Sequence, residues 1–490
     1  MTYVSNASSI LTRRHLLQGA ASLAASCLLP GCGYSVNASS AANSLPLPNG
    51  PITEGSLLVT TTSIGTIPSR FMGLSYEKLA LTYNYFHSSN HNLIALFRRL
   101  GPGVLRLGGG FVDRLLWTSS SSGSHAQVTS TDIKDLAGFL QATGWLCLYG
   151  LNLATSTPIL AAEEAGFAAL TLGSNLLGIE IGNEPDEYGV AGNYFAGNWT
   201  FQDFLSRWYP FRSAILQAAP HIPITGPVTG GGNHISSWTL PFGQAVTPSE
   251  LTLLTQHYYR ASGASTTSTA AFLISPDKQL TTELVTLGAG ARQLGIPYRL
   301  SECNSFSNGG APGVSDSYAS SLWVIDFLFD AAIGGATGIN MHGGGQGPGY
   351  TPIADDSGAV IGARPEYYGL LLFSLVGSGT LLQTQLSVGG IEATAYAVRS
   401  ASGGLKIMLV NKDPRQNLLI NIQANQRVET ASLQTMTGAS LSATSGVTIQ
   451  GAEVNSDGGF APASPTTLVP SAERTNCYVP PLSAVLISIA

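Results

Sequence analysis

The stretch LLGIEIGNEPDEY, residues 176–188, changes abruptly from an apolar run to a polar cluster. The apolar part has the composition of a buried strand, which we expect to end at Glu184. Only 10% of the chain is charged, so the polar residues between Asn183 and Glu187 need an explanation. A polar residue there can cap a following helix, or a carboxyl group at the end of a barrel strand can supply a catalytic acid. The rest of the sequence decides between these two interpretations.

The same alternation recurs along residues 69–378. Short runs rich in Val, Ile, Leu and Tyr are separated by amphipathic patterns such as NLIALFRRLG and STDIKDLAGFLQATG. The strand candidates are FMGLSYE (71–77), VLRLGGG (104–110), WLCLYGLN (145–152), LLGIEIGNE (176–184), IPITGPV (222–228), LTQHYY (254–259), YRLSECN (298–304) and ATGINMHGG (336–344). About eight alternating units predict a (β/α)8 TIM barrel. An open doubly wound sheet has a similar periodicity, but no G-x-G-x-x-G loop follows the first strand, which argues against a dinucleotide-binding fold.

The pattern changes in the last part of the chain. Short alternating strands separated by turn residues follow, such as IEATAYAVRS, LKIMLVNKD and SAVLISIA. They predict a β-sandwich over residues 379–490, with the boundary near residues 375–383. The segment SLLVTTTSIGTIP, residues 56–68, has no helix of its own, and we expect it to join the sandwich.

The N-terminus has the features of an export signal. Residues 1–32 carry the Arg13–Arg14 pair, an apolar stretch and small residues before Cys32, in the manner of a twin-arginine export signal. The sequence LPGC at the end of this segment resembles a bacterial lipobox. Cys32 would then carry a lipid, and this lipid would be the protein's only contact with a membrane. Residues 33–55 are small and polar and predict a flexible tether. The expected location is the periplasm or the cell surface.

Composition excludes several other classes. A net charge of −6 without long Lys/Arg clusters argues against nucleic acid as a partner. Beyond residue 32 only Cys147, Cys303 and Cys477 remain, too few for a disulfide framework. No spacing of Cys and His residues suggests a metal site, and no cofactor is implied.

Two glutamates stand at predicted strand ends where a barrel enzyme places its chemistry. Glu184 ends the fourth strand and Glu302 the seventh. Glycoside hydrolysis needs two such carboxyl groups, about 5–5.5 Å apart for retention of configuration and about 6.5–9.5 Å apart for inversion. The same acidic strand ends would also serve as helix caps or as partners for Arg106, so spacing alone leaves these alternatives open.

The local motifs resemble those of glycoside hydrolase family 79, the β-glucuronidase and heparanase family. The matching motifs run in order along residues 71–375: FMGLSYE, LRLGGGFVD, IGNEPDEY, QHYY, SECNSFSNGGAP, Gly349-Tyr350 and RPEYYGLLL. The resemblance implies a retaining exo-β-glucuronidase that removes terminal glucuronate from a glycoside or oligosaccharide. The alternatives are a related glycosidase with another sugar or endo specificity, and a cell-surface carbohydrate-binding protein without activity.

The same resemblance assigns roles to individual residues. Glu184 would be the acid/base and Glu302 the nucleophile, while Asn183 would hold the 2-hydroxyl of the sugar. The remaining expected substrate contacts are Glu77, His257, Tyr258, Asn308, Gly309, Gly349 and Tyr350, of which Tyr258 would lie near Glu302 or the uronate carboxylate. Arg106 is expected to orient carboxylates.

One departure from the family pattern concerns the uronate pocket. Family members are expected to carry Tyr five residues after the nucleophile, where this chain has Phe306 and Ser307. This difference leaves two alternatives: a remodelled carboxylate pocket, for which the uronate assignment is weaker than the retaining mechanism, or a pocket that accepts a modified uronate such as a 4-O-methyl form.

Overall fold

The computed structural model describes residues 49–190, 192–195, 197–246, 250–346 and 348–490. The predicted export signal and most of the tether lie outside these residues. Among the described residues, no helix is both long enough and apolar enough to span a bilayer.

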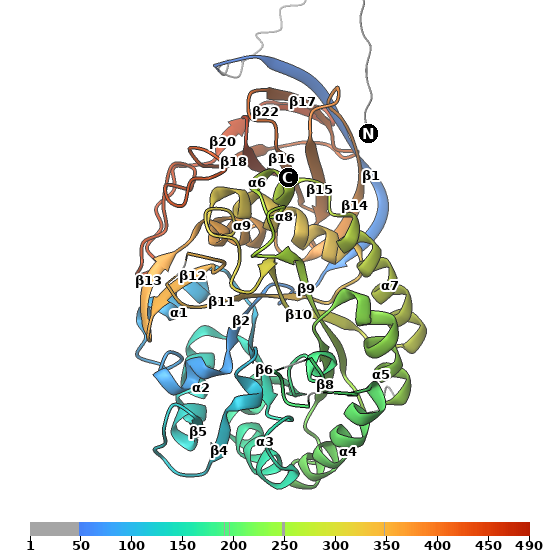
Figure 1. The fold of residues 1–490 in the computed structure, drawn as a ribbon. Coiled ribbons are helices and arrows are strands. Elements are labelled where there is room, and N and C mark those ends of the chain that lie inside the picture. Colours follow the sequence, from blue (N-terminus) through green and yellow to red (C-terminus); the bar gives the residue numbers. More distant parts are fainter. Residues whose placement is uncertain (1–48, 191, 196, 247–249, 347) are drawn as a thin grey trace, which may run out of the picture. The chain divides into compact units, whose positions relative to one another are not determined.

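Eight parallel strands close into a barrel, which confirms the predicted fold class (Figure 1). Neighbouring barrel strands follow one another in the chain, and β11 pairs with β2 to close the ring. The barrel strands are β2 (Gly73–Glu77), β3 (Val104–Gly108), β6 (Leu146–Leu151), β7 (Leu176–Ile181), β8 (Ile224–Thr229), β9 (Leu253–Ser262), β10 (Tyr298–Ser307) and β11 (Ile339–Gly343). Since all eight are parallel, their carboxyl ends meet at one rim, where barrel enzymes place their active sites.

Helices alternate with these strands, as the amphipathic patterns predict. They are α1 (His91–Arg99), α2 (Ser130–Thr143), α3 (Pro158–Leu172), α4 (Phe201–Ala218), α5 (Leu240–Ala245), α6 (Ala270–Ile274), α7 (Lys278–Leu294), α8 (Tyr318–Ile333) and α9 (Pro365–Ser374). Local sequence determines where two of these helices, α2 and α4, begin: Thr129 and Thr200 each form a capping box with an Asp three residues later. Two short pairs of strands lie outside the barrel sheet: β4 (Leu116–Thr118) with β5 (Gln127–Thr129), and β12 (Ile353–Asp356) with β13 (Ala359–Ala363).

The last part of the chain forms one sheet of eleven strands together with β1 (Ile52–Ile67). The others are β14 (Gly379–Ser387), β15 (Ala393–Arg399), β16 (Leu405–Asn411), β17 (Asn417–Gln423), β18 (Ala431–Thr437), β19 (Thr448–Ile449), β20 (Thr466–Leu468), β21 (Pro470–Ser471), β22 (Arg474–Val479) and β23 (Ser483–Ile489). The long β1 pairs with β17 along one edge and β14 along the other, and irregularities interrupt its register after Val59.

The sheet curls so that strands far apart in its order share one apolar core. Leu57 of β1, Ile407 of β16 and Ile420 of β17 are all buried in this core, together with Ile487 of β23. The arrangement is therefore sandwich-like, although hydrogen bonds connect all its strands into one sheet. Residues 56–68, expected to join the sandwich, lie almost entirely within β1.

Barrel and sheet pack into one compact unit through α8. The Tyr318 hydroxyl donates to the Leu482 carbonyl at 2.8 Å, and the rings of Phe329 and Tyr396 stack at 4.2 Å. Asp326 of α8 also forms an ion pair with Lys412 at 2.7 Å. Because α8 connects β10 to β11, the sheet braces the part of the barrel that carries Glu302.

Candidate active site

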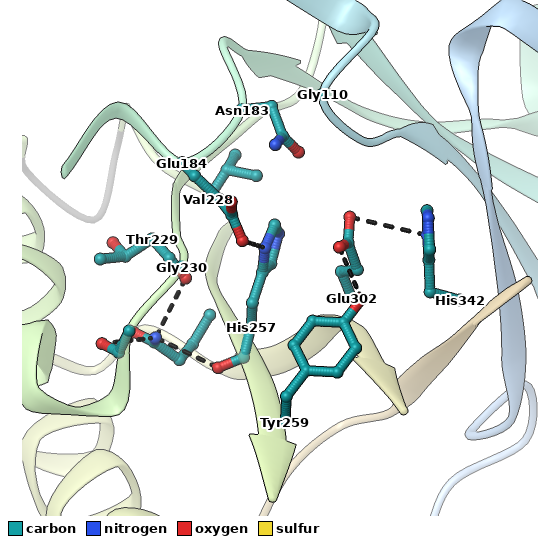
Figure 2. Close-up of polar contacts among 12 residues, drawn as sticks. Gly110, Asn183, Glu184, Val228, Thr229, Gly230, His257, Tyr259, Glu302 and His342 are labelled. Carbon is teal, nitrogen blue, oxygen red and sulfur yellow. Dashed lines mark hydrogen bonds and ion pairs between the residues drawn. The ribbon is translucent and has the colours of Figure 1, made fainter. Parts of the chain in front are cut away.

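Glu184 and Glu302 face one another in a cavity of about 740 Å³ at the carboxyl ends of the barrel strands (Figure 2). One carboxylate oxygen of each, and a ring nitrogen of His257, all lie within 4.8 Å of one another. Asn183 also lines this cavity. Glu184 and Glu302, predicted at the ends of different strands, therefore lie close enough for one small molecule to contact both.

Glu302 is nearly fully buried and held by three polar partners. Its Oε2 accepts a 2.6 Å hydrogen bond from Arg106, and its Oε1 accepts a 2.8 Å hydrogen bond from the Tyr259 hydroxyl. His342 Nδ1 lies 3.6 Å from Oε2. Burial alone would raise the pKa of Glu302, but the charges of His342, His257 and Arg106, with the Tyr259 hydrogen bond, lower the pKa well below its ordinary value. Glu302 is therefore held as an anion, the form that a nucleophile requires.

Arg106, on β3, forms hydrogen bonds to three residues at or below the cavity. This guanidinium is fully buried and donates to Glu180 at 2.6 Å, to Glu302 at 2.6 Å and to the side-chain oxygen of Asn183 at 2.8 Å. Two carboxylates neutralise the buried cation, and the planar guanidinium fixes the orientation of each group. Since the Asn183 oxygen is engaged by Arg106, the amide nitrogen of Asn183 is the group left to donate to a substrate.

Glu184 is presented by an unusual backbone conformation. Strand β7 ends at Ile181, three residues earlier than expected, because Gly182 takes a φ of +90° and turns the chain. Glu184 itself has φ +48°, and its amide donates to the carbonyl of Val228, which has φ +67°. Both conformations are uncommon for residues with a side chain and cost about 1–2 kcal/mol each. The strain aims the half-exposed carboxyl group of Glu184 into the cavity.

His257 lies against Glu184, as Figure 2 shows. Its Nδ1 is 2.8 Å from Glu184 Oε1, and the imidazole is fully buried. This contact fixes the position of the Glu184 carboxyl group at the cavity.

Asp113 holds the loop that carries Asn183, and sequence reasoning missed it. Its carboxylate accepts from the backbone N–H of Asn183 at 3.0 Å and from the Tyr188 hydroxyl at 2.6 Å. It also accepts from the amides of Leu153 and Ala154. Asp113 is the last residue of LRLGGGFVD, but it stands beyond the strand end, in a short 3-10 helix, where periodicity does not indicate its direction.

Glu77 and His342 form the opposite wall of the cavity. Glu77, the last residue of β2, accepts hydrogen bonds from the amides of Gly110 and Phe111 at 3.2 and 2.9 Å. Burial raises its pKa. His342 Nε2 lies 3.9 Å from Glu77, while its Nδ1 contacts the Ser75 hydroxyl at 3.0 Å. The contact of His342 with Glu302 was not predicted from the sequence.

The residues expected to bind the uronate carboxylate divide between two cavities. Asn308, Gly309 and Tyr350 line the cavity with the two glutamates. Gly349 lines an adjoining cavity instead, where its backbone approaches the Gly309 carbonyl so closely that a Cβ atom would stand 2.1 Å from that oxygen. Ser307 lines the cavity with the two glutamates at the position where family members carry Tyr.

Phe306 does not replace the missing Tyr. Its ring is fully buried and stacks on Phe272 at 6.3 Å, away from the cavity. The side chain at the cavity wall in this stretch is therefore that of Ser307.

Tyr258 lines the same cavity as the two glutamates, and its contact with substrate stays a prediction. Its hydroxyl donates to Asp277 at 2.5 Å, and its ring stacks on Phe327 of α8. Side chains alternate along a strand, so Tyr258 points away from the face that carries His257, and Tyr259 takes the expected place beside Glu302. The same alternation, applied from His257, would have identified Tyr259.

Two clusters have the composition of a metal site. One consists of Glu184, His257 and Glu302, and the other of Asp186, Glu187 and His234. In the second, His234 Nδ1 lies 2.7 Å from Asp186, and this hydrogen bond raises the pKa of His234.

A closed (β/α)8 barrel with two glutamates close together at the rim formed by the carboxyl ends of its strands is an arrangement that glycoside hydrolysis can use. No family model matches the chain. In sequence it is 25% identical over 350 residues to a β-glucuronidase of Aspergillus niger. The match covers 63% of this chain and 63% of the relative. This similarity confirms the resemblance to β-glucuronidases indicated by the motifs.

Solved structures share the fold over most of the chain. A 4-O-α-L-rhamnosyl-β-D-glucuronidase from Fusarium oxysporum, in complex with Rha-GlcA, superposes with a TM-score of 0.73 at 19% identity, covering 89% of this chain and 100% of the other. A family 51 arabinofuranosidase from Xanthomonas axonopodis gives 0.65 at 15% identity, with 90% and 100% coverage. A family 44 xyloglucanase from Paenibacillus polymyxa gives 0.61 at 12% identity, with 89% and 99% coverage. All three carry the names of glycoside hydrolases.

Proposed function

We propose that this protein is a retaining β-glucuronidase that releases terminal glucuronate by double displacement. The observation that carries the proposal is the pair Glu184 and Glu302, whose carboxylate oxygens approach within 4.8 Å. This approach fits the retaining spacing of about 5–5.5 Å better than the inverting spacing of about 6.5–9.5 Å. The sequence similarity to a β-glucuronidase supports the choice of sugar.

In the first step, the Glu302 carboxylate attacks the anomeric carbon while protonated Glu184 donates its proton to the departing glycosidic oxygen. The bond from the anomeric carbon to the leaving oxygen breaks, and an ester to Glu302 forms. Arg106 and Tyr259 favour the anionic form of Glu302, and Asn183 offers its amide to the 2-hydroxyl. That last contact strengthens as positive charge develops at the anomeric centre.

In the second step, Glu184 accepts a proton from water, which attacks the same carbon and releases Glu302. Once Glu302 is esterified, its negative charge no longer opposes ionisation of Glu184, so the acid of the first step becomes the base of the second. His257, in contact with Glu184 at 2.8 Å, would hold this carboxyl group in position during both steps.

The uronate carboxylate is proposed to meet Tyr350 and the backbone N–H groups of Asn308 and Gly309. No Lys or Arg side chain is among the described residues that line this cavity, so neutral donors would recognise the anion. Glu77 would accept hydrogen bonds from hydroxyls on the far side of the ring. The small side chain of Ser307 at the cavity wall supports acceptance of a modified uronate, such as a 4-O-methyl form.

The test compares p-nitrophenyl β-D-glucuronide with the β-D-glucoside, using residues 33–490 and the Glu302→Gln variant as control. Release from the glucuronide, absent in the variant, is expected. Faster release from the glucoside would leave the two glutamates in place but refute the sugar assignment.

We also propose export to the periplasm or cell surface, with a lipid anchor at Cys32. The motif LPGC in residues 29–32 supports this proposal. Membrane fractionation of cells expressing the full chain tests it: Cys32→Ser should move the protein from the membrane to the soluble fraction. An unchanged distribution would refute the anchor.

A further inference from the structure

Asp186, two residues after Glu184, has a buried charged side chain that neither step of the proposed reaction uses. It belongs to the short 3-10 helix Pro185–Glu187, and solvent reaches none of its side chain. A buried carboxylate is costly unless hydrogen bonds satisfy it. The partners of Asp186 therefore indicate what this residue does.

The partners of Asp186 lie in the loop after β8. The amide of Gly230 lies 3.0 and 3.2 Å from the two carboxylate oxygens, and the amide of Gly231 donates to Oδ2 at 3.2 Å. His234 Nδ1 lies 2.7 Å from the same Oδ2, and this contact raises the pKa of His234, which favours the imidazolium as a counter-charge. Asp186 thus fastens the loop after β7 to the loop after β8.

The backbone of Gly230 in turn packs against the acid/base. A Cβ atom on Gly230 would lie 2.8 Å from both Cδ and Oε1 of Glu184. Oε1 is also the atom that His257 Nδ1 approaches at 2.8 Å. The Glu184 carboxyl group therefore meets an imidazole and a stretch of backbone, and Asp186 holds that backbone.

The backbone conformation of Glu184 needs such support. Its φ of +48° and the φ of +67° at Val228 are unfavourable for residues with a side chain, and strained conformations persist only where surrounding contacts determine them. The hydrogen bond from the Glu184 amide to the Val228 carbonyl is one such contact. The three donors to Asp186 supply further ones, two residues along the chain.

We propose that Asp186 is a positioning residue for the acid/base: it holds the Gly230 backbone, and through it the Glu184 carboxyl group, at the glycosidic oxygen. The inference rests on the proposed function, since it needs Glu184 to protonate the leaving group. Asp186→Asn is the direct test, because it keeps the shape of the side chain but leaves one acceptor oxygen for three donors.

The experiment measures kcat/KM for three aryl β-D-glucuronides whose leaving groups differ in basicity: 2,4-dinitrophenyl, p-nitrophenyl and phenyl. A good leaving group departs without a proton, whereas a basic one needs the acid. Asp186→Asn should lower kcat/KM for the phenyl glycoside by about 10- to 100-fold, since a misplacement of about 1 Å can cost that much. The dinitrophenyl glycoside should stay within about twofold of the wild type. Partial unfolding would instead lower all three values by one common factor.

Two further substitutions act on the same contact without altering Asp186. Gly230→Ala adds the methyl group that would meet the Glu184 carboxyl group at 2.8 Å, so it should displace that group. His234→Gln removes the imidazole but keeps a side-chain donor. Both should reproduce the selective loss of the phenyl glycoside, and they decide the question if Asp186→Asn does not fold.

Asp132→Asn is the matched control. Asp132 accepts hydrogen bonds from the amide and the hydroxyl of Thr129 at 2.7 and 2.8 Å, but it does so at the start of α2 and does not line the cavity. It should lower the melting temperature and leave the ratio of phenyl to dinitrophenyl kcat/KM unchanged.

Glu184→Gln provides the reference, because loss of the acid itself must affect the phenyl glycoside selectively. If it does, and Asp186→Asn keeps the wild-type ratio, the positioning role is refuted while the glucuronidase proposal stands. The same conclusion holds if Asp186→Asn does not fold and both Gly230→Ala and His234→Gln keep that ratio. If no glucuronide is cleaved, or if Glu184→Gln shows no selectivity, both proposals fail together.

Discussion

Replacing Tyr259 by Phe removes one hydroxyl group from the active site and tests how Glu302 is held as an anion. That hydroxyl donates to Glu302 Oε1 at 2.8 Å at the wall of the cavity. A hydrogen bond to a charged group contributes about 1.5–3 kcal/mol. If the bond strengthens catalysis by that amount, kcat/KM should fall by about 10- to 150-fold.

The pH dependence of Tyr259→Phe gives a second readout. The Tyr259 hydrogen bond lowers the pKa of Glu302. Removing it should raise that pKa, and because catalysis needs ionised Glu302, the acidic limb of the kcat/KM profile should move to higher pH. Steady-state kinetics with p-nitrophenyl β-D-glucuronide between pH 3 and 8 would measure both effects.

Tyr258→Phe is the matched control. Its hydroxyl donates to Asp277, whereas that of Tyr259 donates to Glu302, so Tyr258→Phe should lower the melting temperature and leave the pH profile unchanged. If Tyr258→Phe shifts the acidic limb and Tyr259→Phe does not, the assignment of the two tyrosines is wrong.

Three further substitutions test other parts of the account. Glu184→Gln should abolish cleavage of substrates with poor leaving groups, but azide or a good leaving group should partly restore turnover in a p-nitrophenol assay; equal loss for all leaving groups would refute its role as acid. Arg106→Lys should lower kcat by about 100-fold, because an ammonium cannot serve Glu180, Glu302 and Asn183 in one plane; near-normal kcat would refute this positioning role. Glu366→Gln should flatten the pH dependence of the free energy of unfolding. Burial raises the pKa of Glu366 to about 8. This carboxyl group therefore stabilises the fold below about pH 4.5, and the contribution is lost as the pH rises toward 8. Thermal unfolding between pH 5 and 9 measures the slope, and identical slopes in both proteins would contradict that assignment.

The sequence was most informative about strands, because barrel strands are short apolar runs that stop at glycine or a polar residue. All eight barrel strands were predicted, with errors only at their ends. In β7, the expected strand continued to Glu184, whereas Gly182 ends it by taking a positive φ. Periodicity cannot detect this turn, which allows Asn183 and Glu184 to face the cavity.

Contacts between strands were less predictable from the sequence. Tyr259 could have been identified, since alternation from His257 places both on one face. Asp113, by contrast, lies in a loop, and its four hydrogen bonds depend on how three separate segments meet.

Covalent trapping tests the central claim most directly. A 2-deoxy-2-fluoro-β-D-glucuronyl fluoride reacts as the first step requires but is hydrolysed slowly in the second, so the nucleophile stays esterified. Intact mass and peptide mapping should show one fluoroglucuronyl group on Glu302 (peptide SECNSF), and none on the Glu302→Gln variant. Labelling of Glu184 instead, or an active enzyme that forms no adduct and releases the α-anomer, would contradict the account.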